Sequence, residues 1–69
     1  MIDIDLNLKS LADIALNNEK FMSKYGFAIN AVMKDPELSL RKKYEFVVNS
    51  FFHYDAMTRI QEVVERSYV

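Results

Sequence analysis

Three side chains near the start of the chain have the types and spacing of calcium ligands. Asp3, Asp5 and Asn7 alternate, as the first ligands of an EF-hand loop do. That loop also needs a glycine at its sixth position and a glutamate at its twelfth, where this chain has Leu8 and Ile14. The match stops halfway, and the sequence predicts no calcium site.

The sequence offers no catalytic or metal-binding partner for the only histidine, His53. Nucleophilic catalysis would need an activated serine or cysteine beside it, and the chain has no cysteine. Ser50 is one helical neighbour away, which by itself makes no triad, and Asp55 would lie on another face of a helix. We therefore expect no catalytic residue, no metal site and no cofactor, and we expect that the chain is not an enzyme.

One basic cluster could bind an anion. It consists of Arg41, Lys42 and Lys43, with Lys34 shortly before it. Lysine and arginine in such a cluster contact the phosphates of nucleic acids. Three consecutive residues nevertheless spread over about 200° of a helix, neighbouring glutamates offset them, and the net charge of the chain is −1. Nucleic-acid binding is therefore the alternative hypothesis and not the favoured one.

The densest apolar stretch of the chain spans residues 44–54. In a helix, Tyr44 and Phe51 share one face, whereas Phe52 and Tyr54 lie away from it. A helix that is apolar nearly all round must be covered on more than one side, either by its own bundle or by a partner. The candidate partner-binding residues are Tyr44, Phe51, Phe52 and Tyr54, because tyrosine and phenylalanine are enriched in interfaces.

The composition excludes several classes of protein. Of 69 residues, 51% are hydrophobic, and there is one glycine, one proline and no cysteine. Disordered chains, collagens and disulfide scaffolds do not have this composition. No apolar run is long enough to span a membrane, and Asp3 and Asp5 stand where a signal peptide would be basic. We expect a cytoplasmic domain without a membrane partner.

The length of the chain suggests association. A domain of 69 residues buries a smaller share of its surface than a large one. The apolar side chains exceed what such a monomer can hide, and small scaffolds often compensate by oligomerising. Residues with AT-rich codons (Phe, Tyr, Met, Ile, Asn, Lys) also greatly outnumber those with GC-rich codons (Gly, Ala, Arg, Pro), as in a bacteriophage or a low-GC bacterium.

Hydrophobic periodicity predicts helices in most of the chain. Residues 2–9 alternate, so residues 1–9 form either an extended arm or the start of a helix. Ser10 and Asp13 fit a capping box that would open a helix over 10–34. Gly26 either breaks that helix, which we favour, or lies inside it.

The clearest boundary follows at Asp35-Pro36. A residue before proline avoids the α region, so a helix should end near Lys34. Asp35 is then a good N-cap for a helix over 36–53. A last helix over 55–68 would turn Met57, Ile60, Val64 and Tyr68 inward, or else the preceding helix runs on through residue 55 with its buried face rotating.

These patterns predict one all-α domain over residues 1–69, a small bundle of three to four helices. The expected function is a non-catalytic interaction module that self-associates or binds a protein partner as an inhibitor or adaptor. The alternative is a small nucleic-acid-associated regulator that uses Lys34 and residues 41–43.

Overall fold

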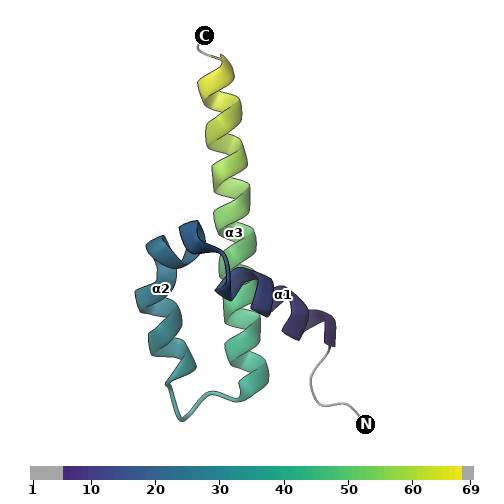
Figure 1. Ribbon diagram of the computed structural model, residues 1–69, viewed down its shortest axis with the longest axis vertical. Coiled ribbons are helices and arrows are strands. Elements are labelled where there is room, and N and C mark those ends of the chain that lie inside the picture. The colour runs from purple at the N-terminus through teal and green to yellow at the C-terminus, as the bar shows by residue number, and fades with distance from the viewer. Residues whose placement is uncertain (1–5, 68–69) are drawn as a thin grey trace.

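The computed structural model describes residues 6–67, and this part of the chain folds into three helices. The helices are α1 (Leu6–Leu16), α2 (Glu19–Met33) and α3 (Leu40–Ser67). α1 crosses α3, α2 runs beside the first half of α3, and the second half of α3 extends beyond both (Figure 1). The predicted small all-α bundle is confirmed.

The helix predicted over 10–34 is divided, but not at Gly26. Asn17 and Asn18 separate α1 from α2, and the Phe21 N–H donates a hydrogen bond of 2.9 Å to the Asn18 side chain. Asn18 is therefore the N-cap of α2. Gly26 lies buried inside α2, and the backbone of the described residues has no glycine with positive φ. The break favoured at Gly26 was wrong because the cap at Asn18 sets the boundary.

The capping box predicted at Ser10 was also wrong. α1 already begins at Leu6, so Ser10 lies within the helix, and Asp13 pairs with the Lys9 ammonium at 3.0 Å instead. Residues 6–8 are helical, which favours the early helix start over an extended arm. The part of the possible arm before residue 6 lies outside the described residues.

The boundary at Asp35-Pro36 is confirmed as an interruption, and its details differ from the prediction. α2 ends at Met33, but α3 begins at Leu40. The Asp35 carboxylate accepts a hydrogen bond of 2.9 Å from the Glu37 N–H within the loop. The hydroxyl of Ser39 accepts one of 3.2 Å from the Lys42 N–H in the first turn of α3. Ser39, an equally good capping residue, thus replaces Asp35 in that role.

α3 is one continuous helix of 28 residues. Of the two alternatives for the last segment, the preceding helix runs on through residue 55 and a separate helix over 55–68 does not form, because no glycine or proline follows residue 36. Asp55 pairs with Arg59 at 3.1 Å along the helix. None of the helices in residues 6–67 combines the length and the apolar content needed to cross a membrane.

The core lies where α1 and α2 meet the first half of α3. Two alanines of α1 have no exposed surface, which lets this helix approach α3 closely. The Phe21 ring packs edge-on against Phe51, with centroids 5.3 Å apart, and against Tyr54 at 5.6 Å. The buried core residues are Ala12, Ala15, Phe21, Ile29, Val47 and Val48.

Candidate interaction surface

The second half of α3 is little covered by the rest of the described chain; Thr58 and Gln61 share a shallow pocket with residues at the start of α2. Every residue from Ala56 to Ser67 is exposed, whereas Val47 and Val48 on the first half are buried. At 1.5 Å per residue, this segment adds about 18 Å of helix beyond the bundle. We call residues 56–67 the distal half of α3. It gives the molecule its longest dimension of 51 Å, against 26 and 17 Å in the other two directions.

The exposed apolar side chains near and along the distal half form a single row. Their spacing of three or four residues places them on one side of a helix. Each of the five large ones is about half exposed, from 45% at Val64 to 56% at Ile60. We call this row the distal face; it consists of Phe52, Ala56, Met57, Ile60, Val63 and Val64.

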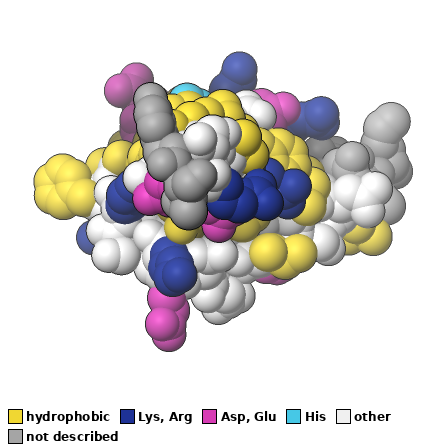
Figure 2. Space-filling view, turned by 90° about the horizontal axis from the view of Figure 1, so that it is seen from above, with side chains coloured by type: hydrophobic (Ala, Val, Ile, Leu, Met, Phe, Trp, Pro, Cys, Tyr) yellow, Lys and Arg dark blue, Asp and Glu magenta, His cyan; other side chains and the backbone are white. Residues whose placement is uncertain are grey.

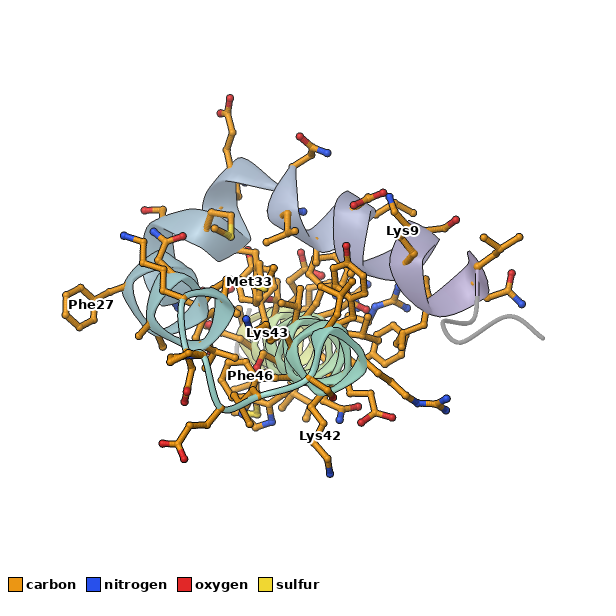
Figure 3. The ribbon with its side chains drawn as sticks, turned by 90° about the horizontal axis from the view of Figure 1, so that it is seen from below. Lys9, Phe27, Met33, Lys42, Lys43 and Phe46 are labelled. Atoms are coloured by element: carbon orange, nitrogen blue, oxygen red, sulfur yellow. The ribbon has the colours of Figure 1, made fainter. Side chains whose placement is uncertain are left out.

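The distal face lies on the opposite side of α3 from the core. Phe51 packs against the core, and Ile60 follows it by nine residues, which is two and a half turns of an α-helix. Lys42 precedes Ile60 by 18 residues, five full turns, so it marks the same side of the helix. Figure 3 shows Lys42 pointing away from α1. The fold therefore offers the distal face nothing to pack on.

A space-filling view from the C-terminal end of α3 shows the same arrangement. Hydrophobic side chains gather beside the only histidine, on the edge of the molecule that faces away from α1 (Figure 2). His53 is exposed and lies one heptad before Ile60, at the near end of the distal face. Within residues 6–67, no three histidine, aspartate or glutamate side chains converge as a metal site would require.

A row of alternating charge borders the distal face. Its members follow one another at four, three and four residues, so they share one flank of the helix. Arg59 pairs with Asp55 at 3.1 Å, and all four line a shallow groove together with Thr58 and Val63. We call this the charged row; it consists of Asp55, Arg59, Glu62 and Arg66.

Only one of the four aromatic residues predicted to bind a partner reaches the free surface. Tyr44, Phe51 and Tyr54 are partly buried and pack against the core, whereas Phe52 is 51% exposed on the distal face. Aromatic density alone could not separate these roles, because one helix carries apolar residues on two sides. Which of these aromatic residues are free to bind depends on which side of α3 the bundle covers.

In the last segment, the residues that the sequence analysis expected to face the core do not do so. Met57, Ile60 and Val64 were expected in the core, and all three are exposed. Tyr68, expected inward with them, lies outside the described residues. The drift of the apolar stripe after Phe51 was the available signal. In a helix without a break, this drift indicates a second face and not a second core element.

The predicted anion-contact residues do not form one surface. Arg41 pairs with Glu45 at 3.3 Å. Lys42 and Lys43 point in different directions from the start of α3 (Figure 3). Lys34 belongs to the C-cap of α2, on a different element. The divergence expected from the helical spacing is confirmed.

The outer side of α2 carries a basic surface that the sequence analysis did not single out. Phe27 is 92% exposed and points away from the bundle (Figure 3). Lys20, Lys24 and Lys34 lie at helical spacing around it. In the described part of the chain, none of these three ammonium groups belongs to an ion pair. The signal that could have found this surface was the spacing of 20, 24, 27 and 34.

Comparison with known proteins adds no relative. No protein-family model matches the chain, no curated protein is significantly similar to it in sequence, and no solved structure is significantly similar to its fold. The interpretation of the distal face therefore depends on its own geometry.

Proposed function

We propose that this chain is a non-catalytic protein–protein interaction module of the cytoplasm, and that the distal face is its contact surface. The module either self-associates or binds a protein partner as an inhibitor or adaptor. The observation that carries the proposal is a continuous row of half-exposed apolar side chains on a helical segment that the bundle does not cover.

The size of the distal face supports this proposal. Aromatic side chains have on the order of 150–250 Å² each and aliphatic ones less, so the five half-exposed residues present up to about 500 Å² of apolar surface. The total accessible surface is 5576 Å², so this one row supplies about a tenth of it. Patches of this size on a monomer are often functional. Burying apolar surface at about 25 cal/mol per Å² is the main driving force for association.

The continuity of α3 also supports the proposal. A helical segment of about 12 residues is marginal in water without tertiary contacts. Here the distal half continues a helix whose first half is fixed by the core, and the Asp55–Arg59 pair bridges the junction. The apolar row is thus held in helical order before any partner arrives, which lowers the entropy cost of binding.

Photo-crosslinking tests the contact surface directly. Benzoylphenylalanine is placed at Ile60 on the distal face or at Thr58, which is exposed but lies about 200° around the helix. We expect a covalent protein adduct from position 60 in producing cells, either with the chain itself or with another protein, and little adduct from position 58. Equal yields at the two positions, or no adduct at position 60, would contradict the proposal.

The alternative of a small nucleic-acid-associated regulator has less support. The predicted cluster at residues 41–43 diverges, and Arg41 is already paired with Glu45. The lysines around Phe27 on α2 are the better candidate for an anionic ligand, because they share one side of a helix. A measured DNA or RNA affinity that falls by orders of magnitude with rising salt would favour this alternative. The variant Lys20→Glu would then weaken it, whereas Lys42→Glu would not.

A further inference from the structure

We propose that the occupant of the distal face is the distal half of a second copy of this chain, packed antiparallel with the two Ile60 side chains near the two-fold axis. This inference rests on the proposed function and names its partner. It follows from the area of the distal face, from the self-complementary order of its apolar residues, and from the position of Lys42.

The area of the distal face matches what a stable dimer needs. A standard interface buries about 800 Å² per partner, and about 65% of a homodimer interface is apolar. These values call for roughly 500 Å² of apolar surface from each chain. The exposed row on the distal face offers an area of that order. A second copy would therefore cover the row and its flanks without requiring the bundle to open.

The apolar residues are self-complementary when the helix is reversed about Ile60. In an antiparallel pair, residues whose numbers add to about 120 face each other, and each flank meets the same flank of the other helix. Met57 then faces Val64 of the second copy, and Ala56 faces Val63 of the second copy. Small residues lie opposite larger ones, and all of them come from the exposed set. An isologous two-fold interface has this property.

The charged row lies outside the proposed interface. Read along the chain, its charges alternate as negative, positive, negative and positive at positions 55, 59, 62 and 66. Counted from Ile60, these four residues lie about 100–160° around the helix, so in the same antiparallel register they do not face their counterparts in the second copy.

A parallel pair would place like charges together. Lys42 lies on the same side of α3 as Ile60, five turns earlier, and is exposed. A parallel, in-register dimer would bring Lys42 of one copy against Lys42 of the other. It would also align the two helix dipoles in the same direction. The antiparallel pair keeps the two Lys42 residues at opposite ends and opposes the dipoles. The structure therefore favours the antiparallel orientation.

Single-cysteine variants test this arrangement, because the natural chain contains no cysteine. His53→Cys and Ser67→Cys are chosen since both positions are exposed, flank the apolar residues and face each other in the proposed register. In the antiparallel dimer, two copies of position 53 are about 21 Å apart along the axis, beyond a short bismaleimide. A mixture of the two variants should therefore crosslink efficiently, and each variant alone should not.

The same experiment separates the possible failures. Efficient crosslinking of each variant with itself would show a parallel pair and overturn the proposal. No crosslinking in any mixture, with a monomer in sedimentation at high concentration, would also overturn it. If position 60 still gave a photo-adduct with another protein in that case, the proposed function would stand with a different partner. If that adduct were absent too, both would fail.

A matched pair of substitutions controls for folding. Ile60→Asp places two carboxylates at the proposed two-fold axis, and we expect the dimerisation constant to weaken by at least about 30-fold. Thr58→Asp adds the same charge on the opposite side of α3, and should leave dimerisation within about threefold. Circular dichroism checks that both variants keep their helices. Equal effects of the two substitutions would overturn the proposal.

Discussion

Phe51 and Phe52 are neighbours in the sequence and lie in different environments on α3. The Phe51 ring meets the buried Phe21 ring at 5.3 Å in an edge-on contact, whereas Phe52 is 51% exposed on the distal face. One step of about 100° around the helix separates the two roles. The core side of α3 thus ends within one residue of the side that is free to bind.

Alanine substitutions should separate these two roles. Phe51→Ala removes a ring from the aromatic cluster, and we expect the free energy of unfolding to fall by about 2–4 kcal/mol. Phe52→Ala should change stability by no more than about 0.5 kcal/mol in the monomer, because its side chain is half in water. It should instead weaken self-association. Urea unfolding at low concentration and sedimentation measure the two effects, and reversed results would contradict the assignment.

Gly26→Ala should stabilise the bundle. Gly26 lies within α2, where glycine costs about 1 kcal/mol relative to alanine. An added Cβ atom would meet only the Met22 Cε atom, at 3.8 Å, which is an ordinary contact. We therefore expect unfolding to become less favourable by up to about 1 kcal/mol. A lower stability in urea titration would show that the helix needs glycine for a reason other than space.

Asn18→Ala and Ser10→Ala test which residue caps a helix. Asn18 accepts a hydrogen bond from the Phe21 N–H, so its loss should cost about 1 kcal/mol of stability. Ser10 lies exposed within α1, so alanine there should be neutral or slightly stabilising because of its higher helix propensity. Thermal unfolding followed by circular dichroism makes the comparison. A larger loss at Ser10 would restore the capping box that the sequence predicted.

The Lys9 ammonium should titrate above the ordinary range for lysine. Its hydrogen bond to Asp13, at 3.0 Å, and the charge of Asp13 raise the pKa of Lys9, with a smaller contribution from Tyr44. Because the pKa is higher in the folded state, the pair adds stability below the unfolded pKa and loses it as pH rises through the folded value. Lys9 and Asp13 both lie at the surface, so the effect on stability should be small.

An NMR titration of the Lys9 side chain measures this shift. In the variant Asp13→Asn the pKa of Lys9 should return toward its ordinary value, since both the carboxylate acceptor and its charge are removed. An unchanged Lys9 titration in the variant would contradict the pairing.

Sequence reasoning reached the fold class and the loop at Asp35-Pro36, because proline and apolar periodicity act locally. It misplaced the helix starts, because Asp35 and Ser39 are both good caps and only tertiary packing decides between them. It also placed Ile60 in the core. A helix with apolar residues on two sides does not itself reveal which side the bundle covers.

The order of the three helices along the chain has a consequence for synthesis. Phe21 and Ile29 belong to α2, but the residues that bury them, Val47 and Phe51, belong to α3. At 5–20 residues per second, a few seconds separate the addition of Phe21 to the growing chain from that of Phe51. During this interval the inner side of α2 has only α1 to pack against within its own chain. The nascent hairpin of α1 and α2 therefore has an uncovered apolar side on the ribosome, and folding completes only when α3 is made.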